Sequence, residues 1–305
     1  MKTTILSIFL LCSSLIAAQA QISEKQLKPF YPKGYTLANT YGDGMTQSSG
    51  DILLELTSNE ESDFKKLILI HNGKNKLTKI AENNNLVMVD DMLGDAGGNS
   101  LSLSENTLKI NYSQGTFGYL KEVSIILKKE NDGQYYCSTY ASSLKEQGKE
   151  NKKERLRMAA SQIGKINFAK ANEELILEKA KSVKDFSNNF GYEPESATIS
   201  GTITKKLFYG APNYGKTPEK DEKIWVYILK KEQAINVFGD INPENPETAD
   251  ETHTNISEIQ IYSTNKNLDF KNLEDKKVKL QGVFQSAQSG NQFTNVVFQA
   301  KKVLK

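Results

Sequence analysis

The sequence is poor in cysteine and in histidine, with two of each among 305 residues. Cys12 lies in an apolar segment close to the N-terminus, which leaves Cys137 as the only cysteine in the body of the chain. A single cysteine cannot form an intramolecular disulfide, so we expect packing rather than cross-links to stabilise the fold. Cys137 lies in a stretch with strand-like alternation, which predicts a small buried hydrophobic residue rather than a nucleophile.

The two histidines, His71 and His253, are too few to build the usual metal and catalytic centres. A zinc site generally needs several His or Cys ligands at regular spacing. The chain also lacks a G-x-S-x-G nucleophile motif and the glycine-rich motifs that bind nucleotides. We therefore expect no cofactor and no enzymatic activity. A hydrolase that uses paired carboxylates is the alternative, because two well-placed acids suffice for glycoside hydrolysis.

Neither sign of charge is in excess, since 39 Lys and Arg residues face 37 Asp and Glu residues. Nucleic-acid-binding proteins usually carry a basic excess, so this balance argues against a nucleic-acid partner. After residue 20 no apolar run approaches the roughly 20 residues that a membrane helix needs. The composition, 38% hydrophobic and 25% charged, instead predicts a folded chain without stable membrane insertion.

The N-terminus combines a basic start, a short apolar run and small residues before Gln21. This arrangement in residues 1–20 predicts a secretory signal peptide that is cleaved before Gln21. The residues preceding Cys12 are Phe9-Leu10-Leu11, whereas a bacterial lipobox has a small residue directly before its cysteine. We therefore expect a secreted or periplasmic protein without a lipid anchor.

Hydrophobic patterns predict a mainly β protein, with a β-rich N-terminal domain (21–144), a charged and partly helical connector (145–194) and a C-terminal barrel domain (195–305). Segments 67–70 and 86–89 are apolar on both faces, as central buried strands are. Asp132-Gly133 between two alternating runs predicts a β-hairpin. The composition of 156–163 and 173–183 favours helix, with a short strand at 175–177 as the alternative within the second segment.

The C-terminal domain contains about five strand-like segments, a short helical segment near 270–273 and long irregular loops. This combination predicts a small β-barrel of the OB type. Segment 224–229 is apolar on both faces and contains Trp225, the only tryptophan of the chain. Residues 240–254, rich in Pro, Asn, Glu and Asp, are expected to form its least ordered loop.

The segment from Tyr209 to Asp221 reads Y-G-A-P-N-Y-G-K-T-P-E-K-D. It resembles the G-x-P-x-[YF]-G-x-x-P-x-x-D loop of an uncharacterised family of bacterial secreted domains, and the likeness extends through the C-terminal part of the chain. Members of that family usually carry histidines near the end of the domain, where this chain has Asn291, Gln292 and Phe293. The resemblance implies a fold but no activity, and a metal or acid–base role of those histidines does not carry over.

The N-terminal half more weakly resembles secreted bacterial β proteins of the FG-GAP type. In those proteins a Gly-Asp-x-Asn-x-Asp-Gly-x-x-Asp loop precedes an apolar strand, and its acidic side chains hold calcium. Here Asp43 and Asp51 occupy two of the acidic positions, and no carboxylate lies between them. Calcium takes six to eight oxygen ligands, several of them charged, so we expect this loop to have lost its calcium.

The loop from Tyr209 to Asp221 is the strongest candidate for a binding site. Gly210 and Gly215 allow backbone conformations closed to other residues, and two prolines stiffen the loop. Tyr209 and Tyr214 offer rigid amphipathic surface for a sugar ring or a protein partner. We therefore expect these four residues and Asp221 to bind an envelope protein or glycan. The alternative is a structural loop whose tyrosines cover an open end of the barrel.

Two further hypotheses rest on acidic residues. Asp221 is the acid to suspect first in a hydrolase of envelope polymers, against a solvated or loop-bracing role. A calcium-stabilised module would use Asp90, Asp91 and Asp95, which with Asn99 belong to an acidic, glycine-rich stretch. Their spacing differs from that of an EF-hand loop, so an ordinary solvated loop is the alternative there.

Overall fold

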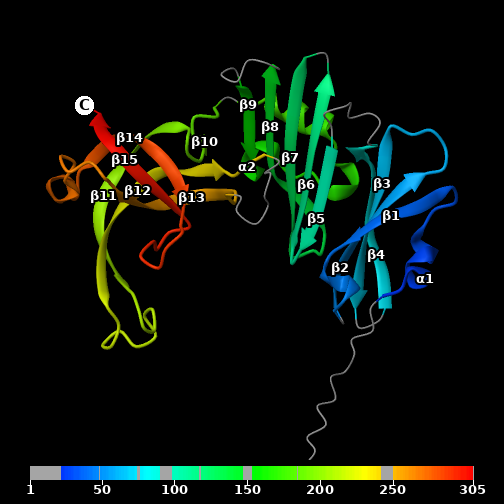
Figure 1. Cartoon of the computed structure of the whole chain (residues 1–305), viewed down its shortest axis with the longest axis horizontal. Helices are drawn as coiled ribbons and strands as arrows, with labels where there is room; N and C mark the ends of the chain where they lie inside the picture. The colour runs from blue at the N-terminus through cyan, green and yellow to red at the C-terminus, as the bar shows by residue number, and fades with distance from the viewer. Residues whose placement is uncertain are drawn as a thin grey trace, which may run out of the picture.

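The computed structural model describes residues 22–304 apart from 48, 74–75, 90–97, 117, 147–152, 184 and 242–249. The predicted signal peptide, residues 1–20, and the acidic candidates Asp90, Asp91 and Asp95 therefore lie outside the described residues. The described chain is mainly β, as the sequence predicts: two antiparallel sheets precede a closed five-stranded barrel (Figure 1). None of the helices within the described ranges is long and apolar enough to cross a membrane.

The first sheet is a four-stranded antiparallel meander in the order β1-β2-β3-β4. Its elements are α1 (Glu24–Leu27), η1 (Lys28–Phe30), β1 (Tyr35–Tyr41), η2 (Asp43–Met45), β2 (Ser49–Ser58), β3 (Phe64–Gly73) and β4 (Lys76–Met88). Both faces of this sheet are buried. Leu53 and Leu69 face the second sheet, while Leu54 and Ile68 pack against the N-terminal segment. Segment 67–70 is apolar on both faces for this reason, and its prediction as a central buried strand is confirmed.

The second sheet is a five-stranded meander in sequence order. Its strands are β5 (Gly98–Ser104), β6 (Thr107–Thr116), β7 (Tyr119–Lys129), β8 (Tyr135–Glu146) and β9 (Lys153–Ala159). The predicted hairpin at Asp132-Gly133 connects β7 and β8, and Gly133 adopts the positive φ that this turn requires. One face of this sheet packs on the first sheet and on α2 (Ala160–Ile163), η4 (Phe168–Lys170) and α3 (Glu173–Ala180).

Two local predictions are wrong because tertiary packing overrides them. Residues 156–163 were expected to be helical, yet β9 occupies Lys153–Ala159 and only α2 is helical. Met158 pairs with Tyr140 of β8 and is fully buried, so strand pairing outweighs the helix propensity of this segment. Segment 86–89 was expected to be central, yet β4 is an edge strand; Leu86 and Val87 are buried by the shared core instead.

The helix predicted at 173–183 is confirmed as α3, and the alternative strand at 175–177 is wrong. The Asn172 side chain accepts a hydrogen bond from Leu175 N at 2.7 Å and so caps the helix N-terminus. Ile176 is buried in the core between the sheets. Capping together with burial of one face therefore decides for helix here.

The barrel has the strand connectivity of an OB fold, as the sequence predicts. It consists of β11 (Ser196–Tyr209), β12 (Lys223–Phe238), β13 (His253–Tyr262), η5 (Phe270–Leu273), β14 (Lys277–Ser286) and β15 (Val296–Leu304), with β10 (Asn189–Gly191) added parallel to β12. The sheet closes because β13 pairs both with β12 and, in parallel, with β15. At the bulge beside Gly282, an added Cβ would lie 2.0 Å from Gln299 O, so only glycine fits.

The barrel is attached to the edge of the second sheet. Arg157 of β9 donates to both carboxylate oxygens of Glu195, at 2.6 and 2.9 Å, and Arg155 also bonds that carboxylate. Beside these ion pairs, Phe238 of the barrel packs on Ala141 and Ala159 of the sheet. Strand β9 lies inside the stretch predicted to be a connector, and it forms part of this attachment.

Cys137 is almost fully buried in the core of the second sheet, and burial raises the pKa of its thiol to about 12. We expect the folded protein to react negligibly with a thiol reagent at pH 8, because the thiolate is the reactive form. After unfolding in guanidinium chloride, a chain cleaved before Gln21 should release one thiol equivalent. Rapid reaction of the native protein would contradict the burial, and a second equivalent would mean that Cys12 is retained.

Candidate functional site

The β11–β12 ribbon continues beyond the barrel wall and ends in the loop that the sequence singles out (Figure 1). We call this ribbon and its loop, residues 204–228, the arm. Gly210 N donates to Glu222 O at 2.8 Å, and Glu222 N donates to Ala211 O at 3.0 Å, which closes the base of the loop. Tyr214 N donates to Gly210 O at 3.0 Å. Backbone hydrogen bonds therefore define the conformation of this loop.

Asp221 braces this loop from within. Its side chain is only 7% exposed and accepts hydrogen bonds from Asn213 N and Gly215 N, both at 2.8 Å, and from Thr217 N at 3.3 Å. Both carboxylate oxygens are therefore engaged with backbone groups. This geometry corresponds to the loop-bracing role that was the alternative to a catalytic acid, and it holds the loop in one conformation.

Tyr214 is the most exposed large apolar side chain of the described residues, at 63%. It stands at φ +52°, directly before Gly215 at φ +91°. A left-handed pair of this kind makes a sharp turn, and Gly215 avoids the strain that a side chain would add. A Cβ added at Gly215 would lie 3.7 Å from the Tyr209 ring, so Tyr209 supports the turn from below. Of the two tyrosines predicted to bind a ligand, Tyr209 therefore supports the turn, whereas Tyr214 is exposed to solvent.

The β14–β15 loop lies beside the arm. Phe293 stacks on Phe208 with ring centroids 4.6 Å apart, and a Cβ added at Gly290 would lie 3.7 Å from the Tyr214 hydroxyl. Gln260 of β13 holds this loop, because its amide donates to Asn291 O at 3.0 Å and accepts from Phe293 N at 2.7 Å. The structure therefore brings together the β11–β12 and β14–β15 loops, which are the loops that OB folds commonly use to bind ligands.

Trp225 is a surface residue that the sequence pattern did not reveal as such. Its segment is apolar on both faces, yet the indole is 56% exposed on the arm, with Lys205 Nζ 5.4 Å from the ring centre. Trp225 pairs with Leu207, so it lies on the opposite face of the ribbon from Phe208. One sequence feature could have indicated this exposure: Trp225 lies only four residues after the candidate loop, where the ribbon has left the barrel.

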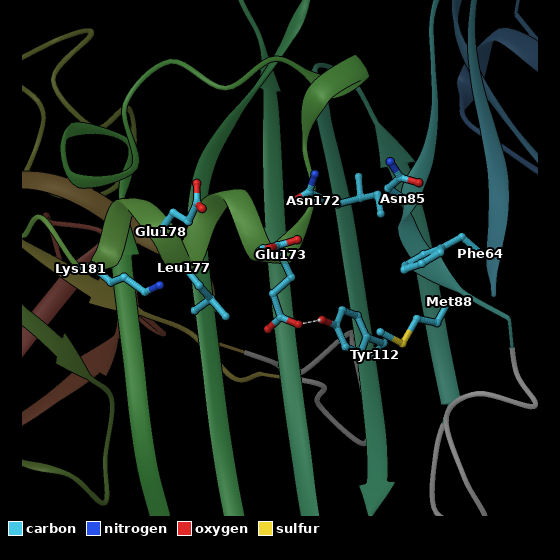
Figure 2. A pocket seen from close by; sticks show the side chains of 11 residues that line it. Phe64, Asn85, Met88, Tyr112, Asn172, Glu173, Leu177, Glu178 and Lys181 are labelled. Carbon is cyan, nitrogen blue, oxygen red and sulfur yellow. Dashed lines mark hydrogen bonds between the residues drawn. The ribbon is translucent and has the colours of Figure 1, made fainter.

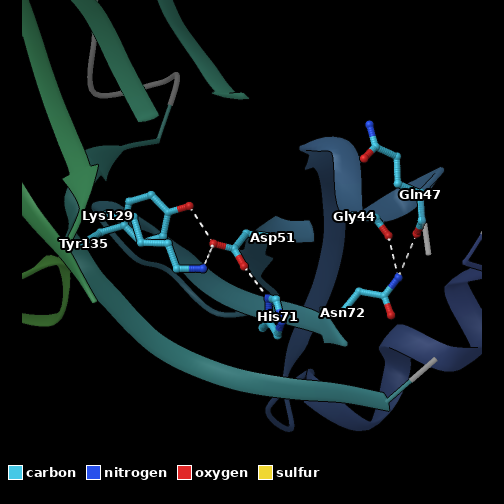
Figure 3. A network of polar contacts seen from close by, with 7 residues as sticks. All are labelled: Gly44, Gln47, Asp51, His71, Asn72, Lys129 and Tyr135. Carbon is cyan, nitrogen blue, oxygen red and sulfur yellow. Dashed lines mark hydrogen bonds and ion pairs between the residues drawn. The ribbon is translucent and has the colours of Figure 1, made fainter. Parts of the chain in front are cut away.

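A network of polar side chains joins the two N-terminal sheets (Figure 3). Asp51 of β2 accepts hydrogen bonds from Lys129 Nζ and Tyr135 Oη of the second sheet, each at 2.7 Å. Its other oxygen lies 2.7 Å from Nδ1 of His71, on β3. Burial alone would raise the pKa of Asp51, but the hydrogen bonds from Lys129, Tyr135 and His71 outweigh it and hold that pKa below its usual value.

The same end of the first sheet is fastened by Asn72. Its buried amide donates to Gly44 O and to Gln47 O, both at 3.0 Å, and so ties the segment around η2 to β3 (Figure 3). Asp51 was interpreted from sequence only as a remnant of a calcium loop, and His71 only as one of two histidines that are too few for a metal or catalytic centre. The missed signal was a pair of polar residues in otherwise apolar neighbouring strands.

A second acid, whose side chain is only 17% exposed, fastens α3 to the second sheet. Glu173 accepts hydrogen bonds from Tyr112 at 2.5 Å, from Tyr140 at 2.6 Å and from Lys121 at 2.7 Å. These donors come from three neighbouring strands, β6, β8 and β7. Burial, and then the negative charge of Glu173, raise the pKa of both phenols far above the ordinary value.

Within the described ranges, no group of three or more His, Cys, Asp or Glu side chains is arranged to hold a metal ion. The calcium hypothesis for Asp90, Asp91 and Asp95 falls on residues outside those ranges and stays a prediction. His253 lies at the start of β13, and its pKa is lowered, mainly by burial. Comparison of the chain with family models, with curated proteins and with solved structures produced no match.

Proposed function

We propose that this protein is an exported, non-enzymatic binding protein whose barrel holds an extended cell-envelope glycan on the arm. The observation that carries the proposal is the placement of Tyr214 and Trp225. These are the two most exposed large apolar side chains of the described residues, and both lie on the arm. Exposed aromatic side chains on a stiff support are typical of binding surfaces, because little entropy is lost when a ligand orders them.

The chemistry of the arm suits sugar rings. An aromatic ring offers an apolar face to the C–H groups of a sugar, and the tyrosine hydroxyl offers a polar edge. Because Asp221 holds the backbone on both sides of Tyr214, the position of this residue is fixed before a ligand arrives. A glycan is favoured over a nucleic acid because Lys206 of the arm is paired with Glu258 and the whole chain carries a formal net charge of only +2.

The test uses the only tryptophan of the chain as a reporter, because Trp225 lies on the arm. Titration with a soluble chain of N-acetylglucosamine units, chitotetraose, should change its fluorescence in a saturable manner. Purified peptidoglycan sacculi should sediment the protein. We expect Tyr214→Ala and Trp225→Ala each to weaken sedimentation with sacculi about tenfold, which corresponds to about 1.4 kcal/mol.

Tyr119→Ala is the matched control, because Tyr119 is an exposed tyrosine on β7 of the second sheet. It should bind sacculi as the unaltered protein does. Equal binding by the Tyr214→Ala, Trp225→Ala and Tyr119→Ala variants would rule out the arm as the binding surface. Tight binding to a single-stranded oligonucleotide without binding to sacculi would replace the glycan by a nucleic acid.

A further inference from the structure

A cavity of about 560 Å³ lies between α3, the second sheet and the end of the first sheet (Figure 2), and none of the residues that line it belongs to the arm. Cavities of this size hold small organic molecules. Its walls come from β3, β4, β6 and α3, and it is lined by Phe64, Asn85, Leu86, Met88, Tyr112, Asn172, Glu173, Glu174, Leu177, Glu178 and Lys181. Since Glu173 fixes α3 to the second sheet, that wall of the cavity is held in place without a ligand.

The floor of the cavity is apolar and partly aromatic. Phe64, Met88 and Leu177 project into it, and Tyr112 contributes its ring while its hydroxyl is bound to Glu173 (Figure 2). A polar or strongly hydrated molecule would lose water on this floor without gaining hydrogen bonds. The floor therefore favours a ligand with an apolar part. The aromatic rings and the Met88 thioether are polarisable, so they make favourable dispersion contacts with such a group.

The rim is acidic. Glu174 and Glu178 are four residues apart on α3, which places them on neighbouring turns of the same helix face. Both are exposed, and neither has a hydrogen-bond or ion-pair partner among the described residues. Glu173 is already matched by Lys121, and Lys181 is the only cation of the lining. The rim thus retains a negative charge that favours a cationic ligand group, and the aromatic rings of the floor favour it too.

We propose that this cavity binds a small amphiphilic cation, an organic amine whose apolar body lies on the floor and whose ammonium group lies beside Glu178. This proposal is independent of the function proposed for the arm. Three probes matched in shape test it: 3-phenylpropylamine, 3-phenylpropanoate and 3-phenylpropanol. Binding is measured by calorimetry and by the NMR shift of the Met88 methyl group, because Met88 lines the cavity.

We expect the amine to bind and to shift the Met88 methyl signal, with the carboxylate about tenfold weaker because it meets the acidic rim. Glu178→Gln should weaken the amine roughly threefold and leave the alcohol unchanged, as expected for one exposed charge. Leu177→Trp, which fills the cavity, should abolish binding of both. Its melting temperature verifies that it is folded.

Glu105→Gln is the control, since Glu105 is an exposed acid in the β5–β6 turn and does not line the cavity. It should bind all three probes as the unaltered protein does. Equal affinity for the amine and the alcohol would overturn the assignment of a cation. No Met88 shift with any probe at millimolar concentration would overturn the site itself, as would undiminished binding to a folded Leu177→Trp variant.

Discussion

Replacing Asp51 with alanine is expected to destabilise the folded protein by about 3 kcal/mol, because each buried donor that loses its acceptor costs about 1–3 kcal/mol. The variant would leave the Lys129 ammonium and the Tyr135 hydroxyl without their acceptor between the two sheets. The measurement is the free energy of unfolding from urea denaturation, followed by circular dichroism.

Asp43→Ala provides the control, because Asp43 lies in η2, shortly before β2, and its side chain is exposed. A change within about 0.5 kcal/mol is expected for it. If the two variants unfold at the same urea concentration, the network of Asp51 does not hold the sheets together. Asp51→Asn should fall between them, since an amide oxygen still accepts hydrogen bonds but carries no charge.

The same network makes a pH-dependent contribution whose sign follows from the lowered pKa of Asp51. A carboxyl that is more acidic in the folded state stabilises the fold above its unfolded pKa, here about 3.8. That stabilisation disappears as the pH falls through the lower folded pKa, because the folded carboxyl then takes up a proton. The difference in unfolding free energy between the unaltered protein and Asp51→Ala should therefore narrow below about pH 3.8. A constant difference down to pH 2 would contradict this account.

Replacing Glu173 with alanine is expected to cost about 3 kcal/mol or more, because each buried donor left without an acceptor costs about 1–3 kcal/mol. The two phenols concerned, Tyr112 and Tyr140, are almost fully buried, and Lys121 would lose its ion pair as well. Detachment of α3 from the sheet should also accelerate hydrogen exchange of its amides. Urea unfolding and native-state hydrogen exchange measure the two effects.

The neighbouring acid supplies a matched control. Glu174 occupies the same first turn of α3 and gains the same favourable interaction with the helix dipole, but its side chain is exposed. Glu174→Ala should therefore cost at most about 1 kcal/mol. Similar losses for Glu173→Ala and Glu174→Ala would mean that the contacts to Tyr112 and Tyr140 contribute little.

Local patterns were sufficient for much of the architecture. The strand-like segments predicted for the C-terminal domain include β11, in which the buried side chains of Ala197, Ile199 and Ile203 belong to the core of the barrel. The Asp-Gly turn predicted the β7–β8 hairpin. Such features depend on residues close in sequence, so periodicity and turn chemistry report them directly. Strand β9 escaped prediction because its partner β8, rather than its own propensity, determines its conformation.

The candidate loop was recognised from its glycines, prolines and tyrosines, but the roles of its residues were not. Asp221 braces the backbone, Tyr209 supports the turn and Tyr214 is displayed. The exposure of Trp225 was not predicted, because an apolar run does not reveal where the ribbon leaves the barrel. A side chain's exposure depends on which other segments cover it, and those segments are distant in sequence.

The sequence by itself determined that the chain forms strands with one or two apolar faces and that a hairpin turns at Asp132-Gly133, and it predicted a barrel in the last third of the chain. Only the tertiary structure decided that Asp51 meets Lys129, 78 residues away, and that Glu173 joins three strands and borders a cavity. The reason is physical. Strand and turn formation depend on short-range sterics and hydrophobic periodicity, whereas a buried charge finds its partner only after the sheets have packed.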